Sequence, residues 1–332
     1  MAQLSFIRKT IMKKEIYFAA GCFWGAEHLF RQVDGVLDTE VGFANGHVEN
    51  PTYQEVYTDA TGHAETVRVT YDPLRVSLPF LLSLYFRSVD PTSLNRQGGD
   101  RGTRYRTGIY FVDDADRPFV DYALAQEALL HDSPLCVEAL PLRVFYRAEE
   151  YHQDYLGKNP DGYCHLPEAL FDMARRSSDD RTRQKSQQYG LLLKQISALA
   201  ADESDALALM ANMAALIHGT LGFWWTGFYR VKGGELLLGP FQGPPACMRI
   251  GYGKGVCGTA WERRATLLVP DVEAFPGHIA CSADSRSEIV VPVFRGDEVA
   301  AVLDIDSQHH AAFDACDQYW LERCVGLLPR PE

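Results

Sequence analysis

A cysteine at the junction of a predicted strand and a predicted helix is the first residue that could do chemistry. Cys22 stands in the segment Gly21-Cys22-Phe23-Trp24-Gly25, where backbone N–H groups at a helix start favour anions and lower the pKa of a thiol. Thiolate is the nucleophilic form of cysteine, and Phe23 and Trp24 could wall an apolar pocket beside it. The alternative is a buried structural cysteine among core aromatic residues.

A carboxyl group supplies the second candidate. Glu65, Val67 and Val69 are alternate residues of one predicted strand. Because side chains alternate between the two faces of a strand, we expect Glu65 on the same apolar face as the two valines. Burial raises the pKa of a carboxyl group, which allows Glu65 to serve as a neutral proton donor. The alternative is a carboxylate at the strand end that turns toward solvent.

In the second half, Cys247, Cys257 and Cys281 lie in or beside a stretch, 241–287, that is predicted to be irregular. His278 and Cys281 could offer two ligands to a metal, but the cysteine spacings match no zinc pattern. We therefore expect no metal. The remaining cysteines suggest packing residues, Cys136 in an apolar strand-like segment and Cys316 and Cys324 on a terminal helix.

Two carboxylates share one face of a late strand. Asp304 and Asp306 alternate with Leu303 and Ile305, so both acidic side chains point the same way. Such a pair could bind an ammonium group. An ordinary solvated face is the alternative.

Hydrophobic periodicity predicts the elements that position these residues in the first half. A strand over 15–20 leads into a helix over 23–33, and a strand over 66–71 follows Glu65. The further predicted elements are a helix over 77–89, a glycine-rich loop over 95–102, a strand over 105–112, a helix over 115–130, a strand over 142–146, and a loop over 151–165 with a short helix after it.

The second half begins with helices over 187–200 and 205–218. Two hairpins are then predicted, because Lys232-Gly233-Gly234 and Arg295-Gly296-Asp297 are turn signals between apolar runs. Helices that bracket a mainly antiparallel sheet make this half α+β. The hairpin strands cover 223–231 with 235–238 and 288–294 with 298–305, and the last helix covers 314–327.

A polar segment over 175–188 separates the halves. It has no apolar residue, which predicts a linker or the polar start of a helix. A chain of 332 residues favours two domains. We expect an N-terminal extension over 1–11, since Met12 could be a second start, then a domain over 12–174, a linker over 175–186 and a domain over 187–332.

Composition excludes several function classes. The net charge of -12 argues against a nucleic-acid partner, which needs a basic face. The apolar run before Cys22 is too short for a signal-peptide core, and we expect neither a lipid anchor nor a membrane span. Eight cysteines without a Cys-x-x-Cys motif suggest thiols in a reducing compartment, so a cytoplasmic location is expected.

The first half closely resembles the A-type peptide methionine sulfoxide reductases over residues 12–173. That family has an α/β sandwich fold, uses cysteine chemistry without metal or organic cofactor, and reduces the S epimer of methionine sulfoxide in proteins and as the free amino acid. Five ordered motifs carry the resemblance: GCFWG at 21–25, PTY at 51–53, TGHAE at 61–65, RQGGDRGTRY at 96–105 and KNPDGYC at 158–164.

The resemblance implies a role for each matching residue. Cys22 would attack the sulfoxide sulfur and become a sulfenic acid, with which Cys164 would condense to a disulfide. Thioredoxin, as the external dithiol, would restore both thiols. Because His165-Leu166-Pro167 follows Cys164 in place of a glycine-rich tail with another cysteine, a two-cysteine cycle is expected. Phe23 and Trp24 would hold the S-methyl group, Glu65 would donate a proton with help from Tyr53 and Tyr105, and Asp100 would orient the substrate amide or Cys164.

Residues 187–328 resemble the free methionine-(R)-sulfoxide reductases, a catalytic branch of the GAF domain. The matching segments are WTGFY at 225–229, LGPFQG at 238–243, ACMRI at 246–250, GVCGTA at 255–260, GHIAC at 277–281, SEIV at 287–290 and LDIDS at 303–307. The resemblance implies Cys281 as nucleophile and Cys247 as resolver, with Cys257 a competitor for either role. It implies that Glu288, Asp304 and Asp306 hold the amino group and the sulfoxide, and that Trp225 and Tyr229 pack on the thioether.

Together the two resemblances predict one chain that repairs both epimers, which need separate enzymes. The rival hypothesis is a reductase regulated by a GAF domain that only senses a small molecule; a pure sensor would not need three cysteines. A thiol peroxidase is a third hypothesis, but it assigns no function to the Phe23-Trp24 pocket or to the paired Asp304 and Asp306.

Overall fold

The computed structural model describes residues 12–164, 166–176, 179–279 and 284–329. The expected N-terminal extension over 1–11 and the candidate nucleophile Cys281 lie outside the described residues. The chain divides into two compact units, Met1–Thr182 and Arg183–Glu332. The sequence prediction of a mixed α and β fold with two domains is confirmed.

A six-stranded sheet forms the centre of the first unit, in the order β7-β6-β1-β3-β2-β8. Its interior strand β3 (Ala64–Tyr71) pairs antiparallel with both β1 (Lys14–Ala20) and β2 (Val36–Ala44). Only β6 and β7 pair in parallel. The outer strands are β6 (Thr107–Phe111), β7 (Glu138–Pro141) and β8 (Phe145–Arg147).

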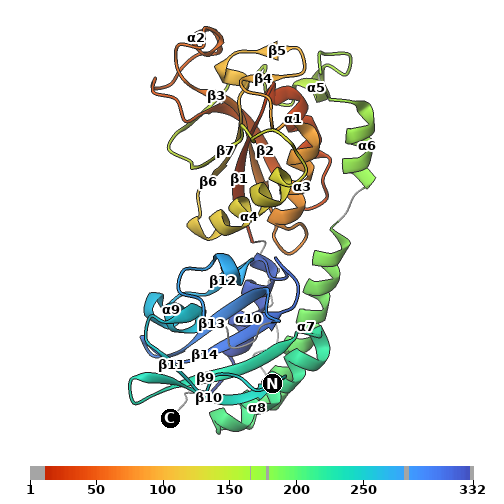
Figure 1. Ribbon diagram of the computed structural model, residues 1–332. Coiled ribbons are helices and arrows are strands. Elements are labelled where there is room, and N and C mark those ends of the chain that lie inside the picture. The colour runs from red at the N-terminus through yellow and green to blue at the C-terminus, as the bar shows by residue number, and fades with distance from the viewer. Residues whose placement is uncertain (1–11, 165, 177–178, 280–283, 330–332) are drawn as a thin grey trace. The chain divides into compact units, whose positions relative to one another are not determined.

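Helices cover one face of this sheet (Figure 1). Helix α1 (Phe23–Arg31) packs on β2 and β3, and α3 (Leu78–Ser88) packs on β1 and on α4 (Arg117–Ala128). The ring of Phe18 on β1 stacks on Phe30 of α1 and Tyr85 of α3 at 4.7 and 5.1 Å between centroids. Since Phe18 pairs with Val67 of β3, the same face carries Glu65, two residues earlier.

Strand β2 was not predicted, although it lies between β3 and β8. In its first half, Val36 to Glu40, apolar and polar residues alternate only weakly, because two of the five residues carry carboxylates. In its second half, Val41 to Ala44, every residue is buried. The glycine-rich loop contains two short strands, β4 (Arg96–Gln97) and β5 (Asp100–Arg101), followed by a 3-10 turn over Thr103–Tyr105. Short helices complete the unit: α2 (Tyr53–Tyr57), a 3-10 turn over Asp114–Asp116, α5 (Tyr155–Lys158) and α6 (Glu168–Arg176).

The second unit is built on an antiparallel six-stranded sheet in the order β11-β10-β9-β14-β13-β12. One face packs on helices α7, α8 and α10 through residues such as Phe228, Val291 and Leu303. The other face packs on α9 and its flanking loops. The elements are α7 (Asp180–Ala200), α8 (Ala206–Leu221), β9 (Trp225–Lys232), β10 (Glu235–Gln242), β13 (Ser287–Arg295), β14 (Glu298–Ser307) and α10 (Ala315–Val325).

The prediction of an irregular stretch over 241–287 is wrong for much of its length. It contains β11 (Arg249–Gly251), α9 (Gly255–Arg263), β12 (Leu267–Val269) and a 3-10 turn over Val272–Ala274. Helix α9 was not predicted because two glycines and a cysteine interrupt its apolar pattern. At Gly258 a Cβ atom would lie 2.3 Å from the carbonyl oxygen of Gly251, so this close approach requires glycine.

The polar segment over 175–188 is mostly helical, since α6 reaches Arg176 and α7 begins at Asp180. Asp179 lies between them and is buried. Its carboxylate accepts hydrogen bonds from the backbone N–H of Ser77 at 2.9 Å and from that of Thr182 at 3.0 Å, and from both hydroxyl groups. One side chain therefore joins Ser77, just before α3, to Thr182 within the first unit.

No helix in the described part of the chain combines enough length with enough apolar character to cross a bilayer.

Candidate active sites

Cys22 precedes the first residue of α1, as the sequence predicts, and its side chain is only 7% exposed. Glu65 enters the same site from β3 and is 1% exposed. The backbone N–H of Phe23 donates to Glu65 Oε2 at 3.1 Å. The strand and the helix thus place a thiol and a carboxyl group together, across 42 residues of sequence. The alternative of a solvent-facing Glu65 is wrong.

Burial raises the pKa of Glu65 to about 8, against smaller opposing effects of the Phe23 N–H and the Arg104 guanidinium. The group is therefore mostly protonated at neutral pH, as its strand parity indicated. A carboxylic acid that accepts one hydrogen bond at Oε2 still has its proton to donate.

The expected lowering of the Cys22 pKa is wrong for the substrate-free site. Burial first, and then the charge of Glu65, raise the pKa of this thiol well above its usual value. The backbone N–H of Trp24 acts in the opposite direction but is outweighed. A helix start favours an anion only when water also solvates the group, and here almost none reaches it.

Aromatic rings shape the pocket beside Cys22. Trp24 stacks on Tyr155 at 3.8 Å between centroids, and its indole N–H donates to His152 Nδ1 at 3.1 Å. The ring of His152 also contacts Phe23. The sequence analysis missed His152 and Tyr155, although two further aromatic residues in a predicted loop were a usable signal.

Tyr53 and Tyr105 face the same carboxyl group. Burial raises the pKa of both phenols, and the charge of Glu65 raises it further. Both phenols therefore remain protonated at neutral pH and can donate hydrogen bonds near Glu65.

Cys164 lies against the first turn of α1. A Cβ atom on Gly25 would lie 2.9 Å from Cys164 Sγ, so the missing side chain makes room for the second thiol. The neighbouring Tyr163 donates its hydroxyl hydrogen to Asp100 Oδ2 at 3.0 Å. Asp100 therefore holds the segment that carries Cys164, which is one of the two roles that the sequence suggested for it.

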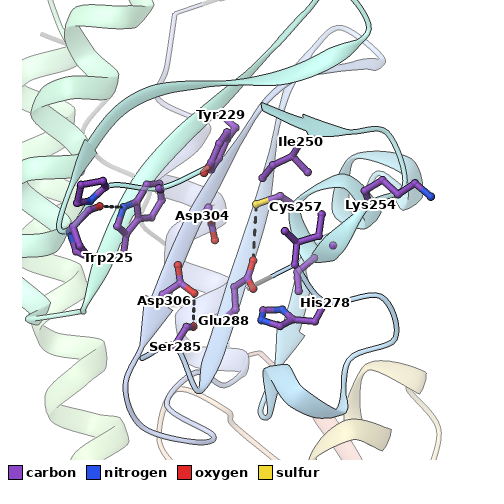
Figure 2. Close-up of a pocket in the computed structure, with 16 residues that line it drawn as sticks. Trp225, Tyr229, Ile250, Lys254, Cys257, His278, Ser285, Glu288, Asp304 and Asp306 are labelled. Carbon is purple, nitrogen blue, oxygen red and sulfur yellow. Dashed lines mark hydrogen bonds between the residues drawn. The ribbon is translucent and has the colours of Figure 1, made fainter. Parts of the chain in front are cut away.

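In the second unit, a pocket opens on the face of the sheet that α9 covers (Figure 2). Trp225 and Tyr229 of β9 form one wall, with ring centroids 5.9 Å apart. The Trp225 indole N–H donates to Pro244 O, and the Tyr229 hydroxyl donates to Cys247 O at 3.0 Å. The loop with Cys247 is thereby fixed beside the aromatic wall.

Three carboxyl groups line the pocket beside this wall. Glu288 of β13 pairs with Asp306 of β14, and Asp304 lies two residues before it on the same face. Burial raises the pKa of Glu288 and Asp304 well above their usual values, and it raises the pKa of Asp306 to about 6. The alternative of a solvated face is wrong, because Asp304 is 6% exposed. Ser285, which the sequence analysis missed, donates to Asp306 Oδ1.

The cysteines of this unit occupy different surroundings. Cys257 of α9 is buried, with Sγ 3.9 Å from Glu288 Oε1. Burial first, and then Asp304 and Glu288, raise its pKa well above the usual range. Cys247 is disulfide-bonded. Cys316 and Cys324 are buried and free, as expected of packing residues, whereas Cys136 is half-buried.

Comparison with known proteins matches the two halves separately. The family model described as peptide methionine sulfoxide reductase matches residues 14–184, and that described as GAF domain matches residues 200–328. A peptide methionine sulfoxide reductase MsrA from Lachnoclostridium phytofermentans is 52% identical over 166 residues, which are 50% of this chain and 100% of that protein.

Among solved structures, a free methionine-R-sulfoxide reductase from Neisseria meningitidis in complex with its substrate is 48% identical, with a TM-score of 0.43, and covers 44% of this chain and 88% of its own. A reduced form of fRMsr from Staphylococcus aureus is 49% identical, with a TM-score of 0.42, and covers 42% of this chain and 92% of its own.

A buried thiol beside a proton-donating carboxyl group, on a sheet covered by helices, defines the class of thiol-dependent oxidoreductases in the first half. The chain belongs to the peptide methionine sulfoxide reductase family, and its second half is a GAF domain. Both family resemblances stated from the sequence are confirmed at this level.

Proposed function

We propose that this chain is a bifunctional enzyme that repairs methionine sulfoxide. The first unit reduces the S epimer, in proteins and as the free amino acid, and the second reduces the R epimer of the free amino acid. The observation that carries the first activity is the contact of Glu65 with the start of α1, beside Cys22. The observation that carries the second is the set of three carboxyl groups that lines one pocket, with Glu288 and Asp304 buried.

In the first unit, the sulfur of Cys22 attacks the substrate sulfur while Glu65 protonates the sulfoxide oxygen. Glu65 becomes a carboxylate as it gives up this proton, and the proton that the Cys22 thiol loses restores the neutral acid. The oxygen atom passes from the substrate to Cys22, so methionine is released and Cys22 becomes a sulfenic acid. Tyr53 and Tyr105 donate hydrogen bonds to the developing oxyanion.

Recycling then uses Cys164, whose sulfur lies over Gly25. Its thiol condenses with the Cys22 sulfenic acid, which forms the disulfide and releases water. An external dithiol, for which we propose thioredoxin, reduces the disulfide by exchange, with its own thiols becoming a disulfide. This cycle needs a reducing compartment, which is consistent with the cytoplasm, and no metal or organic cofactor.

In the second unit, Glu288, Asp304 and Asp306 hold the α-ammonium group and the sulfoxide of the free amino acid, while Trp225 and Tyr229 pack on the thioether. We propose Cys281 as the nucleophile and Cys247 as the resolving cysteine. Cys257 is a weaker candidate, because its burial among carboxyl groups favours the neutral thiol. Thiolate, not thiol, is the attacking form.

The decisive experiment compares free and N-acetylated methionine-R-sulfoxide as substrates of the full-length Cys22→Ser protein. The free amino acid offers an ammonium group to the carboxylates, whereas the acetylated form offers a neutral amide and leaves them unpaired. A site built for a polar partner rejects an analogue that lacks it by up to about 10⁴-fold.

Asp304→Asn keeps the shape of the side chain and removes one charge, so turnover of the free amino acid should fall at least tenfold, roughly what 1.4 kcal/mol of lost binding produces. Glu298→Gln, at the exposed far end of β14, is the matched control. Equal turnover of both substrates would contradict the ammonium pocket. Binding of the free amino acid without any turnover would favour the sensor hypothesis.

A further inference from the structure

The pocket of the second unit contains the donor set of a transition-metal site. Cys257, Glu288 and Asp304 each offer one ligand atom, and these three atoms lie within 4.8 Å of one another. Among the residues that the structure describes, this is the single group of three or more such side chains with that spacing. All three are buried and come from α9, β13 and β14.

The spacing is close to that of a tetrahedral ion. Bond lengths of about 2.3 Å to sulfur and 2.1 Å to oxygen place such ligands roughly 3.6 Å apart around zinc. The observed separation of Cys257 Sγ and Glu288 Oε1 is 3.9 Å. The three ligand atoms lie within 4.8 Å of one another, so binding would draw them together by up to about 1.2 Å through rotation of the side chains.

One atom of this group has no hydrogen-bond partner. Asp304 Oδ1 is buried without a hydrogen-bond partner, although Asp304 is only 6% exposed and lines the pocket. Buried polar atoms are normally paired, and an unpaired one indicates a ligand. Figure 2 shows the side chains of Asp304, Glu288 and Cys257 converging, while Lys254 points away from the three carboxyl groups.

We infer that Cys257, Glu288 and Asp304 bind a divalent transition-metal ion, Zn²⁺ by preference, and that this ion and the amino-acid substrate exclude each other. A thiolate ligand selects zinc over magnesium or calcium. The fourth position falls to water or to His278, which lines the pocket and has a buried Nδ1 without a partner.

Mutual exclusion rests on the proposed function, because it requires that the substrate ammonium group use the same carboxylates. Metal binding would displace the thiol proton of Cys257 and the protons of the two carboxyl groups, so affinity should rise with pH. Zinc would then inhibit the second activity without touching Cys22 and Glu65, which form no such triad within the described residues.

The test titrates the reduced, full-length protein with Co²⁺, which reports thiolate ligation by an absorption band in the near ultraviolet, and then with Zn²⁺ against a chromophoric chelator. We expect one equivalent of metal with a thiolate band. Cys257→Ser should abolish the band, and Asp304→Asn should weaken zinc binding by at least about 100-fold, since second-shell changes alone cost about 10- to 100-fold. Cys324→Ser, a buried cysteine outside the pocket, is the control.

A band that persists in Cys257→Ser, or no band in the parent protein, would overturn the metal site. Free methionine-R-sulfoxide should displace the metal, and simultaneous binding would overturn mutual exclusion. The two proposals fail separately: reduction of the R epimer without metal binding refutes only this inference, and metal binding without reduction refutes only the proposed function.

Discussion

Both units place a cysteine beside buried carboxyl groups, but in different numbers. The site of Cys22 contains one such group, Glu65. The backbone N–H of Trp24 lowers the pKa of Cys22, and the charge of Arg104 lowers the pKa of Glu65. Cys257 lies among Glu288 and Asp304, with Asp306 close enough to act on it. One carboxyl group can stay protonated and serve as an acid. Several together repel each other and favour a cation.

The difference separates two uses of the same chemical groups. In the function proposed above, the carboxyl group of the first unit would act on the sulfoxide oxygen and so govern the rate. The carboxyl groups of the second unit would act on the amino group and so govern which substrate is accepted. The thiol within the cluster is accordingly the less suitable nucleophile.

Cys22→Ser should produce the largest effect. Reduction of the S epimer should fall by more than about 10⁴-fold, as is usual when a covalent nucleophile is lost, whereas reduction of the R epimer should be unchanged. The measurement is turnover of the two resolved epimers of free methionine sulfoxide. Equal loss of both activities would contradict two independent sites.

Cys164→Ser should permit about one turnover of the S epimer per enzyme, because the attack by Cys22 does not need a second thiol but the disulfide does. The assay counts methionine released per protein with thioredoxin as reductant. Cys136→Ser is the control. Sustained turnover in Cys164→Ser would mean that another thiol resolves the sulfenic acid.

Glu65→Gln should slow the chemical step by about 10²- to 10⁴-fold, the usual cost of losing a positioned proton donor. The donor must be protonated, and burial raises the pKa of Glu65 to about 8. The parent kcat/KM for the S epimer should therefore decline as pH rises through about 8, and this decline should disappear in Glu65→Gln. Exposed Glu49→Gln serves as control, and an unchanged single-turnover rate would remove Glu65 from the mechanism.

Gly25→Ala should have the smallest effect and should act on recycling alone. The new methyl group would lie 2.9 Å from Cys164 Sγ and push it away. Multiple-turnover rate should fall about tenfold, within the ~10²-fold that an ångström of misplacement can cost, while single turnover stays constant. Gly190→Ala, where the nearest atom is 3.7 Å away, is the matched control.

Sequence alone predicted the strands and helices whose apolar residues repeat regularly, and the parity of Glu65 and Asp304 placed both correctly on buried faces. It failed at β2 and α9, where carboxylates or glycines interrupt the pattern. The Cys22 pKa was also mispredicted, since a helix start can be read from sequence but the burial of its first turn depends on β3 and the segment after 149. The partners of Trp24, Tyr155 and His152, stand in the sequence as aromatic residues of a predicted loop, but their contact with Trp24 depends on the same packing.

Asp179 has a consequence for separating the two activities by cutting the chain. A first fragment that ends at 174 would lose this carboxylate and leave the Ser77 N–H without its acceptor at the start of α3. A buried donor left without its acceptor costs about 1–3 kcal/mol. A fragment that ends at Thr182 keeps the whole set of bonds, so it should melt at a higher temperature, although it carries the same active site.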